Sequence, residues 1–282
     1  MLDSIYNFIG IILPFDWAEH IFMKNAIMGL LIATPLFGML GAMVVNNKMA
    51  FFSDSIGHGA FTGIAIGTLL GSITTMWSSF IFSIIFAAGI TLVKHKSKNS
   101  ADTIIGVFSS TAVALGLLIM SFSGNQAQIS SFLIGDLLSI TPSEIGFLSL
   151  VFIIVVVIWF FIFNSVLLAS INPALARSRK INTLLIEMIF TTAIAVVVSI
   201  TIQWVGLLII NALLVIPAAA ARNISNNMRQ YHLYSVLISV VSGFFGLALS
   251  YQFNTISGAT IVIVLAIIFF TTLIVRGLLK KG

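Results

Sequence analysis

Asp54 and His58 are the residues of this sequence whose types and spacing best suit chemistry. They lie four positions apart in the segment FFSDSIGHGAFTGIAIGTLLG, which places both side chains on one face of a helix, one turn from each other. Their oxygen and nitrogen donors suit a divalent cation such as Zn²⁺ or Mn²⁺, with other ligands coming from other helices, backbone or water. Two ligands bind weakly, which suits a conduit that must release its cargo. Alternatively, the two side chains bond only to each other, or lie at the cytoplasmic interface.

The same segment carries glycines at four-residue intervals, namely Gly59, Gly63, Gly67 and Gly71. Small residues at this spacing let another helix approach closely. The stripe indicates either a helix that lines the pathway and shifts against its neighbours, or packing alone, and both can hold. His58 is expected to be the only histidine within a span, because the others are assigned to flanks or loops: His20, His95 and His232.

Few other residues offer chemistry. Glu187 lies in the first turns of its expected span, where an interfacial role is favoured over metal ligation, and Asp136 is expected to line the outer mouth or cap a helix. Met39 and Met43, one turn apart, could bind Cu(I), but filling gaps between helices is the better interpretation. The sequence has no G-x-x-x-x-G-K-[ST] phosphate loop. If ATP drives this protein, the ATPase is another chain.

The elements that position these residues must lie in a membrane. Hydrophobic residues make up 59% of the 282 positions and charged ones only 7%, against about 25% in a soluble domain. Mean hydropathy is +1.16. The predicted fold class is therefore an all-α integral membrane protein. With no cysteine, a disulfide framework and a thiolate metal site are both excluded.

The hydrophobic stretches predict eight or nine transmembrane helices in one permease domain, 1–282. Apolar runs long enough to cross about 30 Å of hydrocarbon occur near 23–45, 51–72, 73–93, 103–122, 145–168, 183–202, 204–221, 233–250 and 257–276. Runs that abut near Ser72–Met76 and Gln203 leave room for a half-helix or a re-entrant piece. Residues 1–20 lack Lys and Arg and have an interrupted apolar run, so they predict an interfacial segment on the outer face rather than a secretory signal.

The basic residues predict the orientation. Of 13 Lys and Arg, all but Lys24 fall on alternate loops, so 13 − 1 = 12 obey one orientation. This positive-inside pattern predicts a cytoplasmic C-terminus and, with nine spans, an external N-terminus. The same placement makes topology a better explanation of the pI of 9.7 than a nucleic-acid partner.

Two connections are expected to contain short helices. The external one, 123–144, is rich in apolar residues, which suits a short helix against the outer mouth. The internal one, 171–182, reads INPALARSRKIN, where Asn172 suits an N-cap and Pro173 the first helical position. We interpret 171–182 as a cytoplasmic coupling segment on which a soluble ATPase pushes, against the alternative of an ordinary basic loop.

Several ordered segments resemble the membrane permeases of bacterial ABC transporters for zinc and manganese uptake, along nearly the whole chain. The segments are MAFFSDSIGHGAFTG (49–63), DTIIGVFSSTAVALGLLIMS (102–121), FLIGDLLSIT (132–141), VGLLIINALLVIPAAAAR (205–222) and SGATIV (257–262). Asn172 and Ala174 stand where the family usually has acidic residues, and Asn254 and Ile256 stand where Asp and Pro are common.

This resemblance implies a homodimeric permease in the bacterial plasma membrane, with two cytoplasmic ATPase subunits and an external metal-binding protein that delivers the ion. It implies that Asp54 and His58 lie on the metal pathway. It also implies that 171–182 docks into the ATPase, with Asn172, Pro173, Ala176 and Arg177 as its central residues. It implies no permanently bound cofactor.

The leading hypothesis is an ATP-powered importer of a divalent metal, with zinc preferred over manganese. The alternative is a channel or ion-coupled carrier that works alone, which an internal inverted repeat would favour, and none is evident. A membrane enzyme would need a nucleophile or paired carboxylates at one depth, which only Asp54 and His58 approach.

Overall fold

The computed structural model describes residues 20–71, 75–123 and 133–279, and all regular structure in these ranges is helical. The helices are α2 (Ile21–Asn46), α3 (Phe52–Leu70), α4 (Thr75–Lys96), α5 (Ala101–Ser123), α7 (Pro142–Ile171), α8 (Pro173–Ser178), α9 (Thr183–Val205), α10 (Leu207–Ile224), α11 (Met228–Phe253) and α12 (Ser257–Leu279), with a 3-10 helix, η2 (Leu137–Ser139). The expected all-α fold class is confirmed.

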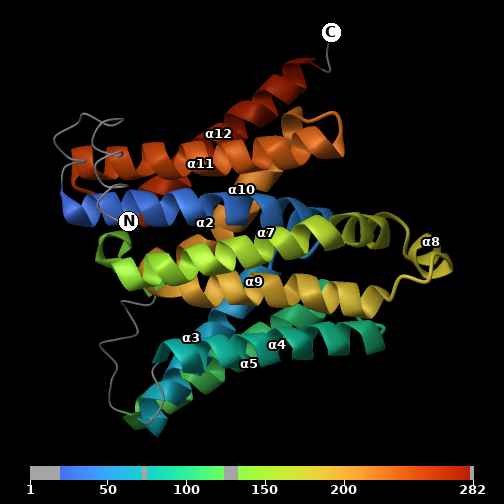
Figure 1. Ribbon diagram of the computed structural model, residues 1–282, viewed down its shortest axis with the longest axis horizontal. Coiled ribbons are helices and arrows are strands. Elements are labelled where there is room, and N and C mark those ends of the chain that lie inside the picture. The colour runs from blue at the N-terminus through green and yellow to red at the C-terminus, as the bar shows by residue number, and fades with distance from the viewer. Residues whose placement is uncertain (1–19, 72–74, 124–132, 280–282) are drawn as a thin grey trace.

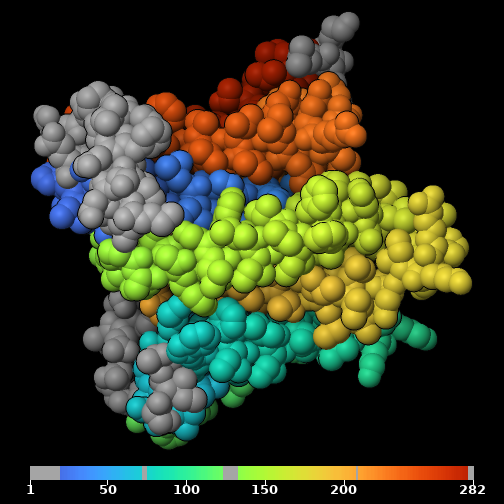
Figure 2. All heavy atoms as spheres, viewed as in Figure 1, coloured from blue at the N-terminus to red at the C-terminus, as the bar shows by residue number. Residues whose placement is uncertain are grey.

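The long helices run side by side. Figure 1 shows α11, α2, α7, α9 and α4 lying across the view, with α8 at the right-hand end, while α12 slants upward to the C-terminus at the upper right. The connection that carries α8 projects from that end of the molecule in the space-filling view (Figure 2). The basic ends of α4, α10 and α12 belong to the same topological side, because successive helices alternate in direction.

Each predicted span corresponds to a helix in the described part of the chain. Seven helices there are long and apolar enough to cross a membrane, and Ile209–Ile224 of α10 forms a shorter apolar helix. The remaining long helix, α3, has 19 residues and carries Asp54, His58 and several glycines, which lower its hydropathy. The polar helix that was expected to line a pathway is thus also the one that departs most from a simple lipid-facing span.

The junction between α9 and α10 is a single residue, Gly206, at φ 89°. A Cβ there would collide with the backbone of Ile134, which packs against this corner. Glycine is required both by the positive φ and by this close approach. The junction lies three residues later than the boundary expected near Gln203, and the helix after it is full-length at 18 residues, about 27 Å.

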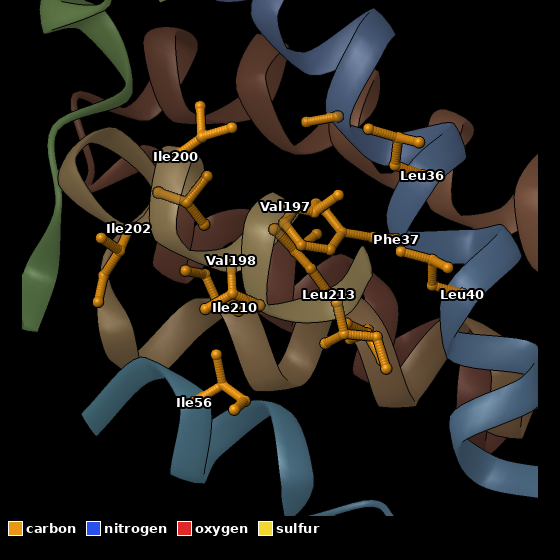
Figure 3. Close-up of a cluster of buried hydrophobic side chains, with 14 of the residues drawn as sticks. Leu36, Phe37, Leu40, Ile56, Val197, Val198, Ile200, Ile202, Ile210 and Leu213 are labelled. Atoms are coloured by element: carbon orange, nitrogen blue, oxygen red, sulfur yellow. The ribbon is translucent and has the colours of Figure 1, made fainter. Parts of the chain in front are cut away.

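The core gathers around α9 and α2. In Figure 3, side chains of α2 (Leu36, Phe37, Leu40), α3 (Ile56) and α10 (Ile210, Leu213) meet Val197 and Val198 of α9, and all of them are almost fully buried. In lipid, such packing stabilises the bundle through van der Waals contact rather than by removing apolar surface from water. Large exposed side chains, such as Phe160 on α7 and Ile263 on α12, suit contact with lipid.

The expected short helix on the external connection is η2, which packs against α2 and α9. Asp136 caps it, because its Oδ1 accepts a hydrogen bond from the backbone N of Leu138 at 3.0 Å. The capping role proposed for Asp136 is therefore confirmed. The interfacial segment predicted at 1–20 lies outside the described residues, apart from His20, the N-cap of α2.

Candidate functional site

The Asp54 and His58 side chains lie side by side on α3, as their spacing predicts. Asp54 Oδ2 is 3.5 Å from His58 Nε2, and the two side chains are 36% and 22% exposed. Asp54 lies in the first turn of α3, where the unpaired N–H groups of the helix stabilise a negative charge. The pair therefore keeps donor atoms open to a ligand although the rest of the first four turns is largely buried.

Hydrogen bonds on both sides of Asp54 fix the direction in which the pair faces. Ser53 Oγ donates to Asn211 Oδ1 of α10 at 2.7 Å. Ser55 Oγ donates to the carbonyl oxygen of Ile105 on α5 at 3.4 Å. Successive helical residues are rotated by about 100°, so Asp54 points between the directions of α10 and α5. The face of α3 that carries Asp54 thus lies between the sides that contact these two helices.

Thr62, which continues the polar face of α3, serves as a bridge to α5. Its hydroxyl lies 2.7 Å from the carbonyl oxygen of Ala112 and 3.0 Å from that of His58, one turn earlier. A buried hydroxyl without such acceptors would be costly. Thr62 therefore positions α3 against α5 and is committed to backbone acceptors.

The glycine stripe packs against α4. A Cβ at Gly59 would lie 2.7 Å from the ring of Phe86, and one at Gly63 would lie 2.7 Å from Cα of Ser79. Gly67 meets Ser78 in the same way, while Gly71 (φ 64°) ends the helix. Of the two interpretations of this stripe, close packing is the one that the geometry supports, because these glycines face away from Asp54.

The donor set on one copy of the chain is small. Within the described ranges, no cluster of three or more His, Cys, Asp or Glu side chains could hold a metal ion. A metal ion held by Asp54 and His58 would therefore have two side-chain ligands from one copy of the chain. Their separation fits a shared ion, because bonds of about 2.1 Å at a tetrahedral angle place two ligand atoms about 3.4 Å apart.

The predicted coupling segment contains the short helix expected of it. Asn172 is the N-cap of α8, with its Oδ1 accepting from the backbone N of Leu175 at 3.0 Å, and Pro173 is the first helical residue. Ala176 is fully buried, whereas Arg177 is exposed. The local structure of this segment is thus as predicted, with one anchoring side chain and a basic surface.

Glu187 does not face Asp54 and His58. It forms an ion pair with Lys94 of α4, and both side chains are about 24% exposed. The interpretation that Glu187 lies near the interface and does not ligate metal agrees with this pairing. Lys94 and Asn211 are the polar partners that sequence reasoning missed, although an isolated Asn in the apolar run LLIINALLVIP was a visible signal.

The expectation that His58 is the only histidine within a span is wrong. His95 lies in the last turn of α4, a helix long and apolar enough to cross a membrane. The same holds for His232, the fifth residue of α11. Its Nδ1 lies 3.0 Å from the carbonyl oxygen of Met228, and its ring packs edge-on against Phe163 at 4.9 Å. The contact of Nδ1 with a backbone carbonyl and the aromatic neighbours indicate that His232 has a packing role. Met43 is likewise fully buried in the core, as gap filling predicts.

The bundle of long apolar helices defines a multi-pass membrane protein, and one of its helices, α3, carries a partly exposed carboxylate–imidazole pair. Residues 19–276 match the ABC 3 transport family, and the chain belongs to it. It is 28% identical to the "Manganese transport system membrane protein MntC" of Listeria monocytogenes, over 89% of this chain and 90% of that protein. It is 30% identical to the "High-affinity zinc uptake system membrane protein ZnuB" of Buchnera aphidicola, over 80% and 87%.

Among solved structures, the fold matches "PsaBC from Streptococcus pneumoniae in complex with Fab" with a TM-score of 0.79, covering 96% of this chain and 95% of that one at 23% identity. The expected family is therefore confirmed. The chain is a permease component of a metal ABC transporter rather than an enzyme, and the ATPase is a separate chain. In bacteria such a protein lies in the plasma membrane.

Proposed function

We propose that the chain forms, with a second copy of itself, the pathway along which a divalent metal ion moves inward, driven by ATP hydrolysis in separate cytoplasmic subunits. The observation that carries this proposal is the Asp54–His58 pair, held 3.5 Å apart on the open face of α3. Oxygen and nitrogen donors at this distance suit Zn²⁺ and Mn²⁺ alike.

The remaining ligands come from other helices, backbone or water, because Asp54 and His58 are partly exposed and supply only two donors. Weak ligation by few protein groups favours release on the inner side. The α8 segment supports the ATPase contact, since a capped helix with exposed basic side chains projects at the cytoplasmic end (Figure 2). An external metal-binding protein delivers the ion, as the resemblance implies.

Zinc is the preferred cargo, and manganese is the second candidate. Relatives named for each metal match this chain at similar identity, and the donor pair does not separate the two metals. The deciding measurement is uptake of radioactive zinc by the complete complex in metal-depleted vesicles, with manganese as competitor. Accumulation of radioactive manganese in the same vesicles, with no accumulation of radioactive zinc, would reassign the cargo to manganese.

The role of Asp54 and His58 in metal transport is tested by substitutions that keep the approximate shape of each side chain. Asp54→Asn and His58→Gln should each lower metal uptake about tenfold or more, on the scale of 10–100-fold losses seen when supporting partners of metal ligands are removed. Assembly with the ATPase should persist. Asp102→Asn and His20→Gln, which change the same residue types at exposed positions, are the matched controls. Wild-type uptake in both Asp54 and His58 variants would remove the pair from the pathway.

Dependence on ATP separates the proposal from a channel or carrier that works alone. Uptake should stop when the ATPase subunit carries a catalytically dead nucleotide site, because no phosphate loop exists in this chain. Uptake that continues at the wild-type rate with the dead ATPase would favour the stand-alone alternative.

A further inference from the structure

A polar hollow lies at the cytoplasmic ends of the helices, and its lining does not include Asp54 or His58. It has a volume of about 580 Å³. Pro173 and Arg177 of α8 line one side, and Asn47, Lys48 and Met49, which connect α2 to α3, line another. The cavity thus separates the coupling segment from the turn that precedes the metal-binding helix.

Lys94 connects the two sides of this cavity. Its Nζ donates a hydrogen bond to Glu187 Oε1 on α9 and lies 3.4 Å from Sδ of Met49. All three residues line the cavity. A flexible cationic side chain from α4 therefore contacts one residue close after the coupling segment and one residue just before α3.

Both partners of Lys94 are tied closely to the elements that they serve. Glu187 lies on the second turn of α9, which begins at Thr183 directly after the coupling segment. Met49 is 1% exposed, and its carbonyl oxygen accepts from the backbone N of Phe52, the first residue of α3, at 2.9 Å. A displacement of the start of α9 therefore reaches Lys94 through Glu187, and a displacement of the start of α3 reaches it through Met49.

We propose that Lys94 is a positioning residue that transmits movement of the coupling segment to α3, and so to Asp54 and His58, through its contacts with Glu187 and Met49. This inference rests on the proposed function, because it assigns a route by which the ATPase acts on the metal site. The adjacent cavity gives α8 and the start of α9 room to move relative to α4. Lys94 touches no metal and acts through the turn at Met49.

The competing explanation is that Lys94 only neutralises Glu187 near the membrane surface. That explanation requires an ion pair but no contact with Met49. The two explanations therefore differ for a reversed pair, Lys94→Glu with Glu187→Lys, which restores the opposite charges but removes the cation of α4 from Met49.

The test measures metal transported per ATP hydrolysed in vesicles that contain the complete complex. Lys94→Met should lower this ratio about fivefold or more, the lower end of typical coupling between sites, while ATP hydrolysis and assembly persist. Lys96→Met, on the same last turn but outside this cavity, should leave the ratio unchanged. The reversed pair should assemble normally and keep the low ratio.

An unchanged ratio in Lys94→Met, or full recovery in the reversed pair, would overturn the inference. If Lys94→Met does not assemble, the reversed pair and Met49→Leu carry the test, and a normal ratio in both contradicts it. Wild-type complex and Asp54→Asn are measured in parallel. ATP-dependent uptake by wild type that Asp54→Asn abolishes upholds the proposed function even where the Lys94 link fails, whereas absence of wild-type uptake refutes both.

Discussion

Asn172 organises the coupling segment through one side-chain hydrogen bond. Removing this N-cap acceptor by Asn172→Ala should cost α8 about 1 kcal/mol, because the backbone N–H of Leu175 loses its partner. Amide hydrogen exchange across 173–178 should then quicken about fivefold. Asn172→Asp, which retains the acceptor, is the control and should exchange as slowly as wild type. Equal protection in Asn172→Ala would show that contacts such as that of buried Ala176 hold α8 instead.

At the residue scale, the sequence predicts those side-chain contacts that follow from the helical repeat. Asp54 and His58 meet because four residues make about one turn, and Asn172 caps α8 because its carboxamide reaches the next turn. The partner of Ser53 could not be found this way, because Asn211 lies 158 positions away and only packing brings α10 to α3. Lys94 escaped notice for the same reason: sequence places it on a basic helix end, and the fold gives it Glu187.

At the element scale, the close packing of α3 on α4 depends on glycine. An added Cβ at Gly63 would lie 2.7 Å from Cα of Ser79 and 2.9 Å from the carbonyl oxygen of Ser78, so backbone must move. Gly63→Ala should therefore destabilise the detergent-solubilised chain by about 1–3 kcal/mol, seen as a lower thermal unfolding temperature. Gly106→Ala on α5, where a Cβ meets open space, is the matched control.

Gly106→Ala should leave stability unchanged or raise it by up to about 1 kcal/mol, because alanine favours helix. Equal stability of the two variants would mean that α4 adapts without cost, and would weaken the close-packing interpretation of the stripe. The sequence alone indicated either packing or a pathway face at these glycines. The structure supports close packing because it shows which neighbour each glycine meets.

The elements themselves were predictable to within a few residues, because apolar runs and basic ends delimit each helix. The largest uncertainty lay where runs abut, near Gln203, since nothing in a continuous apolar stretch marks the corner except Gly206. The structure places the corner there because Ile134 of the external connection packs against it. A contact across more than 70 positions thus decides a boundary that local sequence leaves open.

At the scale of the whole molecule, the orientation joins the two proposed sites into one sequence of events. The basic connections, α8 and the cavity lined by Lys94 lie on one side of the bundle, and η2 with the α9–α10 corner lies on the other. Asp54 and His58 lie near the start of α3, which runs from the basic side outward. In the proposed function, a movement of α8 would therefore reach Asp54 and His58 over a short distance.

The nine-helix topology makes a prediction that depends on α10, the shortest of the long helices. If α10 spans the membrane, the two ends of α11 lie on opposite sides, with Asn226 in the cytoplasm and Gln252 outside.

The chain has no cysteine, so Asn226→Cys and Gln252→Cys each introduce a single reporter at an exposed position. A membrane-impermeant maleimide should label Gln252→Cys in intact spheroplasts and Asn226→Cys only after permeabilisation, with the unaltered chain as the unlabelled control. Labelling of Asn226→Cys but not of Gln252→Cys in intact spheroplasts would mean that α10 does not cross. The basic α10–α11 connection would then lie outside, against the positive-inside pattern that sets the orientation.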